Sequence, residues 1–206
     1  MHYNRSQRPR NGAGLSPAIP RVEPDRPAVP RKESLLILQL QRSTVRSWRF
    51  TDAESLARYA NNREIWRNLR DGFPHPYSLD DATTFIAMAA SAQPETMFAI
   101  CIDDEAIGGI GFGLHSDVER VSAEIGYWIG EPFWGRGIVT EALQAVTRFA
   151  VTEHRLTRVY AVPYAWNEAS ARVLAKAGYT LEGRMRKSVI KDGTVVDQLL
   201  YAYVVD

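Results

Sequence analysis

A glycine-punctuated turn between a strand and an amphipathic helix constrains the fold of this chain more than any other feature. Residues 124–129 form a strand-like run, and residues 130–137 follow it as GEPFWGRG. Apolar residues then recur at helical spacing as far as Ala150. Such a turn aims several backbone N–H groups and the positive end of a helix dipole at one point, which predicts a binding site for pyrophosphate.

Composition limits the class of protein. The 206 residues fit one ordinary domain, and a hydrophobic content of 45% is typical of a globular chain. No apolar run approaches the ~20 residues that cross a bilayer, and no apolar segment follows the N-terminal arginines, so we expect no membrane partner and no secretory signal. The single cysteine, Cys101, excludes a disulfide framework. It favours a cytoplasmic protein with a buried structural thiol.

The first 33 residues differ in composition from the rest of the chain. They hold seven Arg and Lys residues against three acids, together with six of the eleven prolines. This composition predicts a disordered, mildly basic tail over 1–33 and one folded domain over 34–206. No basic stripe with interleaved aromatic residues runs through the domain, so no specific nucleic-acid partner is expected.

The hydrophobic pattern predicts a mixed α/β (α+β) domain whose first half is largely antiparallel, with one β-α-β crossover around the glycine turn. Strands are expected at 35–40, 45–50, 97–102, 106–114, 121–129, 158–162, 179–190 and 194–204. Helices are expected at 52–61, from 78 or 80 to about 90, from the glycine turn to about 153, and at 167–176, with a further turn or two within 61–69. Thr51 and Glu54 predict a capping box, and Asp192-Gly193 predicts a tight hairpin turn.

Three classes of pyrophosphate site compete for the glycine turn. A Walker loop needs a Gly-Lys-Ser/Thr step, which the sequence lacks. A dinucleotide fingerprint would start at Gly135, but Thr140 stands in place of its third glycine, and the turn lies late in the chain with a single crossover around it. The third class is coenzyme A.

At this point the chain resembles the GCN5-related N-acetyltransferase (GNAT) superfamily, in particular its ribosomal-protein N-terminal acetyltransferases. The resemblance covers about residues 42–205. It is carried by FPHPY at 73–77, EIGYWI at 124–129, WGRGIVTEA at 134–142, and NEAS at 167–170 leading to Gly178-Tyr179. It implies the GNAT fold, a mostly antiparallel central sheet of about seven strands with splayed central strands, flanked by about four helices.

The resemblance also implies acetyl-CoA as the acetyl-donor cosubstrate, with no metal. The superfamily turn is usually Q/R-x-x-G-x-G/A with Gly137 at its fourth place, whereas this chain has Trp134 at the first and Val139 at the last. Because the contacts come from backbone amides, we expect the second difference to matter little. The expected cofactor-binding residues are Ile129, Gly135, Arg136, Gly137, Ile138, Val139, Thr140 and Asn167. For Arg136 an exposed loop arginine, and for Asn167 a plain helix cap, are the alternatives.

Acetyl transfer to an amine requires the amine to be neutral. An α-amine, with a pKa of ~7.7–8.0, is roughly a tenth neutral at pH 7, whereas a lysine with a pKa of ~10.4 is almost wholly charged. An enzyme for α-amines therefore needs only a modest base, often acting through water. Glu124, on the strand before the turn, is the best-placed carboxylate. The alternative is a surface residue or an ion-pair partner.

The departing thiolate requires an acid. Many superfamily members place a tyrosine seven residues after the asparagine, where this chain has Leu174. The ribosomal-protein subfamily instead uses the serine three residues after the asparagine, which is Ser170 here. A second capping hydroxyl beside Asn167 is the alternative. By the same resemblance His75, Tyr77 and Trp128 are the expected substrate-binding residues, with ordinary packing as the alternative for each.

The sequence thus predicts an N-acetyltransferase that transfers acetyl from acetyl-CoA to a protein or peptide N-terminal α-amine, directly and in a ternary complex. Acetylation of a small amine, such as a polyamine, an amino acid or a drug, is one alternative. A non-catalytic acyl-CoA-binding module is another. The identity of the amine stays open, as does the choice between a monomer and a homodimer.

Overall fold

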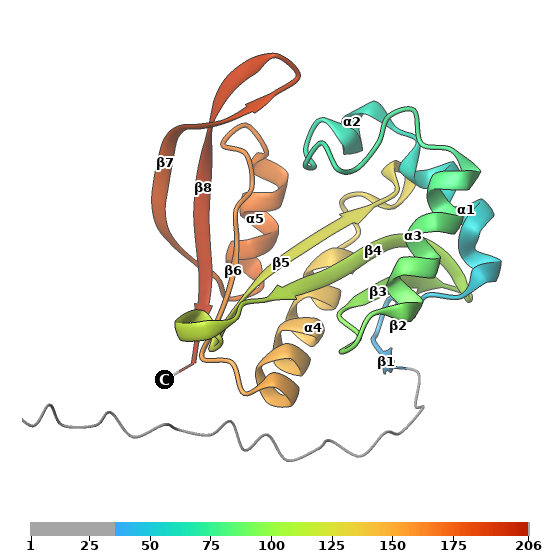
Figure 1. Ribbon diagram of the computed structural model, residues 1–206, viewed down its shortest axis with the longest axis horizontal. Helices are drawn as coiled ribbons and strands as arrows, with labels where there is room; N and C mark the ends of the chain where they lie inside the picture. The colour runs from blue at the N-terminus through green and yellow to red at the C-terminus, as the bar shows by residue number, and fades with distance from the viewer. Residues whose placement is uncertain (1–35, 206) are drawn as a thin grey trace, which may run out of the picture. The chain divides into compact units, whose positions relative to one another are not determined.

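Eight strands form one sheet in the order β1-β2-β3-β4-β5-β6-β8-β7, and only β5 and β6 pair in parallel. The computed structural model describes residues 36–205, so the predicted tail at 1–33 lies outside the described range (Figure 1). The strands are β1 (Ile37–Gln39), β2 (Thr44–Ser47), β3 (Met97–Ile102), β4 (Glu105–Leu114), β5 (Ser122–Ile129), β6 (Arg158–Ala161), β7 (Thr180–Lys191) and β8 (Thr194–Val204). The α-helices are α1 (Ala53–Ala60), α2 (Arg63–Trp66), α3 (Leu79–Ser91), α4 (Ile138–His154) and α5 (Glu168–Lys176).

The predicted mixed, mostly antiparallel sheet with a single crossover is confirmed. The β5-α4-β6 unit is that crossover, and the glycine turn lies within it. The described residues contain one strand and one α-helix more than the family expectation of about seven and four. The shortest elements account for the difference, since β1 has three residues and α2 has four.

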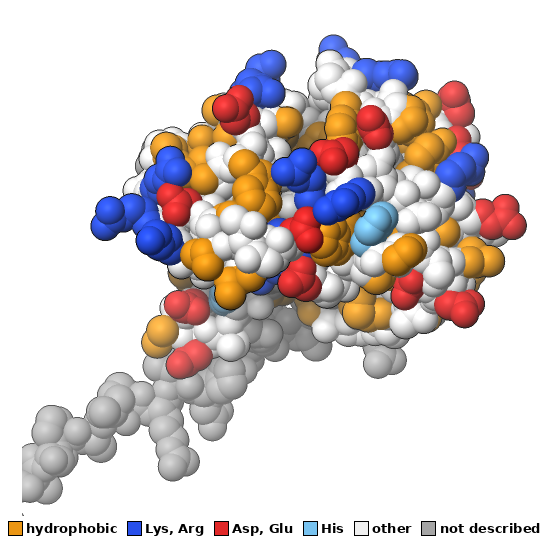
Figure 2. Space-filling view, turned by 90° about the horizontal axis from the view of Figure 1, so that it is seen from above, with side chains coloured by type: hydrophobic (Ala, Val, Ile, Leu, Met, Phe, Trp, Pro, Cys, Tyr) orange, Lys and Arg blue, Asp and Glu red, His pale blue; other side chains and the backbone are white. Residues whose placement is uncertain are grey.

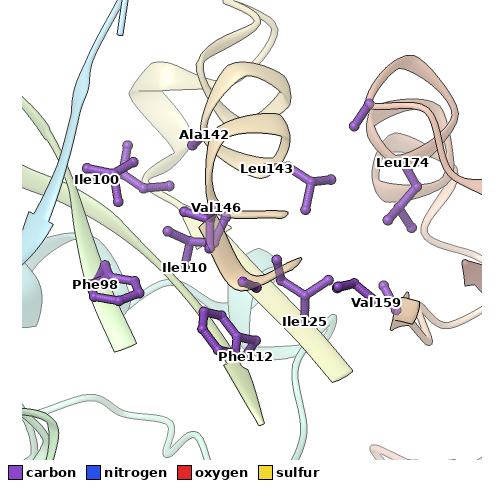
Figure 3. Close-up of a cluster of buried hydrophobic side chains, with 14 of the residues drawn as sticks. Phe98, Ile100, Ile110, Phe112, Ile125, Ala142, Leu143, Val146, Val159 and Leu174 are labelled. Atoms are coloured by element: carbon purple, nitrogen blue, oxygen red, sulfur yellow. The ribbon is translucent and has the colours of Figure 1, made fainter. Parts of the chain in front are cut away.

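Two hydrophobic clusters cover the two faces of the sheet, because successive strand residues point to opposite sides. On β3, Phe98 and Ile100 join the cluster under α4 and α5, whereas Ala99 and Cys101 join the cluster under α1 and α3. Figure 3 shows the first cluster, with residues of α4 facing β3, β4 and β5. The sheet therefore lies between two helical layers. On β5, odd-numbered residues face α4 and α5, and even-numbered residues face α1 and α3.

Cys101 is 1% exposed, and burial raises the pKa of its thiol to about 12. It is a structural thiol, as predicted.

Gly109 on β4 is required by packing, because an added Cβ would come within 2.9 Å of the Trp128 indole nitrogen. No helix within residues 36–205 is long and apolar enough to cross a membrane.

The predicted capping box of Thr51 and Glu54 is wrong. A 3-10 turn precedes α1, and at the start of α1 the Asp52 side chain makes no cap hydrogen bond. Asp52 is 4% exposed and accepts two hydrogen bonds from the Arg46 guanidinium, at 2.8 Å each, and one from the Arg49 backbone. The Asp52 carboxylate thus pairs with Arg46 of β2 and caps the 3-10 turn at the Arg49 N–H, and α1 begins without a side-chain cap.

Candidate active site

The glycine turn adopts backbone angles that favour glycine. Gly135 and Gly137 have φ of 73° and 77°, the left-handed region in which a Cβ is strained. Space is not the reason, since an added Cβ at Gly135 would meet nothing within 4 Å and at Gly137 only the Arg42 Nε, 3.9 Å away. Gly137 is the N-cap of α4, so its conformation directs the chain into the helix.

The N-terminus of α4 offers backbone donors to a ligand. The first intrahelical bond is donated by the Glu141 N–H to the Gly137 carbonyl, which leaves the N–H groups of Ile138, Val139 and Thr140 outside the helical ladder. Within the described residues, no side chain caps this end. The Ile138 side chain is 3% exposed and packs in the α4 cluster, so only its backbone amide can face a ligand.

Trp134 and Arg136 flank the turn. The Trp134 indole N–H donates to the Ile129 carbonyl at 2.8 Å, which ties the turn to the end of β5. Trp134, in the place where the family usually has Gln or Arg, is therefore a structural tether. The Arg136 guanidinium is exposed and lies 5.5 Å from the centre of the Phe133 ring, where it remains within reach of a phosphate.

Arg42 is a site residue that the sequence reasoning missed. It belongs to the β1–β2 connection, and both its backbone N–H and its guanidinium bond Glu141, at 3.1 and 2.9 Å. Glu141 lies in the first turn of α4, with its side chain 18% exposed. A free carboxylate there would repel an anion, so the ion pair removes the main electrostatic objection to a phosphate at this helix end.

The strands beside the turn separate. β5 and β6 are paired only from Ser122 to Glu124, against Arg158 to Tyr160. β5 continues to Ile129 with β4 as its partner, whereas β6 continues beside β8 (Figure 1). Backbone groups of residues 125–129 on the β6 side are therefore left to bind something other than a neighbouring strand. The splayed central strands that the family resemblance implied are present.

Glu124 is the last residue of β5 that pairs with β6. Its side chain is 30% exposed and bonds the Arg70 guanidinium at 2.5 Å. By the alternation of β5, Glu124 shares a face with Trp128, which packs beside α1 and α3. The structure thus shows the ion-pair partner that was the alternative for Glu124, on a side chain that is still accessible.

Asn167 and Ser170 lie on the other face, at the start of α5. The Asn167 side-chain oxygen accepts the Ser170 N–H at 3.0 Å, so Asn167 is the helix N-cap that was its alternative role. Its amide nitrogen remains the group that can donate to a ligand. α5 packs beside α4 through Leu174, and Glu124 and Ser170 consequently approach the gap between β5 and β6 from opposite faces of the sheet.

The predicted acceptor residues lie on the Glu124 face, with different exposures. His75 is exposed, with its ring 5.8 Å from that of Trp66. Tyr77 is 6% exposed and belongs to the α1 and α3 cluster, where burial raises its pKa to about 12. Trp128 packs beside the same cluster, 5.8 Å from Phe73. The packing alternative therefore describes Tyr77 best, whereas His75 is free to meet a ligand.

The tip of the β7–β8 hairpin is fastened to α2 and the loop after it. The Lys191 ammonium group lies 2.6 Å from an Asp71 carboxylate oxygen and 3.8 Å from the centre of the Trp66 ring, and its side chain is fully buried. Arg63 and Asp192 form a second ion pair at 3.0 Å. Figure 2, which looks onto this face, shows basic and acidic side chains close together. We call the contacts of Lys191 and Asp192 with α2 and Asp71 the hairpin clasp.

A pocket of about 260 Å³ lies between α2 and the start of α5. Its lining residues are Glu64, Arg67, Asn68, Trp166, Asn167, Glu168 and Ala169. The Trp166 indole donates to Asn68 at 3.0 Å across it. Within residues 36–205 no cluster of three His, Cys, Asp or Glu residues is arranged to hold a metal ion.

Comparisons with known proteins agree with this geometry. The family model described as "Acetyltransferase (GNAT) domain" matches residues 42–180. The uncharacterized N-acetyltransferase YoaA of Bacillus subtilis is 32% identical over 82% of this chain and 96% of its own length. The [ribosomal protein uS5]-alanine N-acetyltransferase of Escherichia coli is 30% identical over 76% of this chain and 81% of its own.

Among solved structures, Mycobacterium smegmatis RimJ in complex with CoA-disulfide aligns with a TM-score of 0.71 at 26% identity. The alignment covers 82% of this chain and 86% of that one. The family model thus matches two thirds of the sequence. The structure has the fold, the turn before α4 and the separation of β5 from β6 that the family resemblance implies. The chain belongs to the GNAT family of N-acetyltransferases.

Proposed function

We propose that the protein transfers the acetyl group of acetyl-CoA to the N-terminal α-amine of a protein or peptide, directly and in a ternary complex. One observation carries the proposal. The gap between β5 and β6 lies near the N-terminus of α4 with its free backbone N–H groups, and Glu124 and Ser170 lie on opposite faces of the sheet. In this arrangement an amine can reach a carboxylate as its base, and a thioester can reach a hydroxyl as the donor to its sulfur.

The chain's own groups fit coenzyme A. The amides of Ile138, Val139 and Thr140 would hold the diphosphate, with Arg136 supplying charge and Arg42 neutralising Glu141. The backbone groups of residues 125–129 that do not pair with β6, other than the Ile129 carbonyl bound by Trp134, would bind the pantetheine arm together with the Asn167 amide. The bound cosubstrate supplies an activated acyl group, and the protein has to position it beside the amine.

Glu124 would take the proton of the attacking amine. Arg70 beside it is a cation, which disfavours the charged form of an incoming ammonium group. An α-amine loses its proton at ~7.7–8.0 already, so a carboxylate acting directly or through water is sufficient. Ser170 would stabilise the sulfur when the C–S bond breaks, since its hydroxyl lies on the face of the sheet that α4 and α5 cover, opposite to Glu124.

The choice of a protein α-amine over a small amine is supported by the relatives. One of them is the [ribosomal protein uS5]-alanine N-acetyltransferase of Escherichia coli, which aligns over 76% of this chain and 81% of its own. The open pocket between α2 and α5 is also consistent with an extended acceptor.

The test is release of free CoA thiol from acetyl-CoA in the presence of matched acceptors. Peptides with a free α-amine, the same peptides with a blocked N-terminus and an internal lysine, and a set of polyamines, amino acids and amine drugs would be compared. We expect release with free N-termini alone. Faster release with small amines would replace the proposal with the small-amine alternative. Tight CoA binding without release for any amine would favour a non-catalytic module.

A further inference from the structure

Tyr127 makes a contact that the proposed chemistry has not used. It lies on β5 three residues beyond Glu124, where β5 no longer pairs with β6. Its parity directs it to the face covered by α4 and α5, and it is partly buried against that cluster. There its phenolic oxygen lies 2.9 Å from the Ser170 Oγ and 3.4 Å from the Ser170 carbonyl oxygen.

The chemistry of the two hydroxyls decides the direction of this hydrogen bond. A phenol is a stronger donor than an alcohol and a weaker acceptor, because its lone pair is shared with the ring. Burial raises the pKa of Tyr127, so the phenol keeps its proton at neutral pH. Both Ser170 oxygens near Tyr127 are acceptors, which also favours Tyr127 as donor. The proton of the Ser170 hydroxyl is then not needed for this contact.

Ser170 is held from two sides. Its backbone N–H is bound by the Asn167 cap, and its Oγ accepts from Tyr127. With one lone pair of Oγ occupied, the Ser170 O–H has to point away from Tyr127. The Ser170 O–H is thus left available to a group bound in the gap between β5 and β6, where Tyr127 lies.

We propose that Tyr127 is a positioning residue, which orients the Ser170 hydroxyl toward the sulfur of the bound thioester. The inference rests on the proposed function, and it adds a residue on β5 to the group on α5. In the reaction the C–N bond forms, the C–S bond breaks and its electron pair goes to sulfur. The amine loses one proton to Glu124, and the departing thiolate takes one proton from solvent. The Ser170 hydrogen bond stabilises the thiolate, and the Tyr127 hydrogen bond makes Ser170 a better donor.

The experiment measures the pKa of the thiol of bound CoA. The ultraviolet absorbance of the thiolate is recorded against pH for the complex, and the absorbance of the free protein is subtracted. This readout does not depend on turnover. Cys101, the single cysteine, does not interfere because its pKa is about 12. In the wild-type complex an oriented hydroxyl lowers the pKa of the thiol. We expect Tyr127→Phe and Ser170→Ala each to raise it by about 1, the size of one hydrogen bond to a charged group.

Tyr179→Phe is the matched control. Its hydroxyl is bonded to the Thr147 hydroxyl at 2.6 Å under α4, so this change also removes a buried hydroxyl pair, on a residue outside the gap. We expect no change in the thiol pKa for Tyr179→Phe and no further change when Tyr127→Phe is added to Ser170→Ala. In turnover, Tyr127→Phe should lower kcat about tenfold with the Kd of CoA unchanged.

Three outcomes would overturn the inference: a Tyr127→Phe complex that titrates like the wild type, effects that add on the Ser170→Ala background, or a loss confined to CoA binding. Failure of the proposed function looks different. In that case the wild-type protein releases no thiol with any amine, while the titration of bound CoA still reports whether Tyr127 acts on Ser170.

Discussion

Glu124 is an ion-paired carboxylate at the point where two strands separate, and 30% of its side chain is still exposed beside Arg70. We expect Glu124→Gln to lower kcat by about 10²-fold, within the range of general base catalysis, with the Kd of acetyl-CoA unchanged. The defect should shrink as the pH rises through the pKa of the acceptor α-amine, ~7.7–8.0, because the amine then needs no base. Steady-state kinetics across that range would measure this.

The control for Glu124→Gln is Glu182→Gln. Glu182 is also ion-paired, with Arg158, but it lies on β7. Equal kcat values for Glu124→Gln and the wild type at pH 7 would remove Glu124 from the base role.

Arg42 and Glu141 give a second prediction at the scale of single residues. Loss of Arg42 leaves the Glu141 carboxylate unpaired beside the bound diphosphate, so Arg42→Ala should weaken CoA binding about tenfold. Adding Glu141→Gln removes the repulsion and should recover part of the loss. Calorimetric titration with CoA measures both effects.

Arg148→Ala is the matched change for Arg42→Ala, because Arg148 is an exposed arginine on α4, the helix that carries Glu141, well beyond the first turn of that helix. Unchanged affinity in Arg42→Ala, or no recovery in the double variant, would show that the ion pair is only structural.

At the scale of elements, the entry into α4 depends on the backbone of Gly137. Its φ of 77° costs a residue with a Cβ ~1–2 kcal/mol, although the space around it is open. We expect Gly137→Ala to lower the free energy of unfolding by about that amount and to weaken CoA binding, and Gly137→Asn to lose less, since Asn tolerates this conformation better. Urea unfolding measures the first effect.

Gly183→Ala on β7 is the control for Gly137, because Gly183 also has open space around its position and no positive φ. A Gly137→Ala protein as stable as Gly183→Ala would mean that the turn relaxes without cost.

The elements also show what the sequence could predict. The turn before α4 was predictable because the strand, the glycines and the helix are contiguous and each leaves a local signal. The Thr51 cap failed because residues 50–52 form a 3-10 turn, so that α1 begins only after Asp52, whose carboxylate is bound by Arg46 on β2. Arg42, Arg70 and Tyr127 meet partners 99, 54 and 43 residues away. Such pairs follow from the sheet order, and one sequence does not encode that order in any short pattern.

At the scale of the whole domain, the hairpin clasp joins the end of the chain to its first helices. Lys191 and Asp71 are 120 residues apart, yet the ammonium group is fully buried against Trp66. The Trp66 ring in turn lies 5.8 Å from the ring of His75, a predicted acceptor residue. The clasp therefore sets the distance between the hairpin and the loop of His75, which lies on the same face of the sheet as Glu124. We infer that this distance fixes the width of the opening through which the acceptor amine enters, which we call the acceptor entrance.

Lys191→Met tests this role, because it keeps the length of the side chain and removes the charge. A desolvated cation–π contact is worth roughly 2 kcal/mol, and the exposed Asp71 adds at most ~1 kcal/mol, so the domain should lose a few degrees of Tm without unfolding. Hydrogen exchange should rise in residues 63–75, and KM should rise for the acceptor and not for acetyl-CoA. Arg172→Ala, which breaks an exposed pair with Glu168, should change none of these. If exchange in residues 63–75 stayed at the wild-type rate, the hairpin would not be what holds α2 in place, and the acceptor entrance would have to be set by α1 and α3 alone.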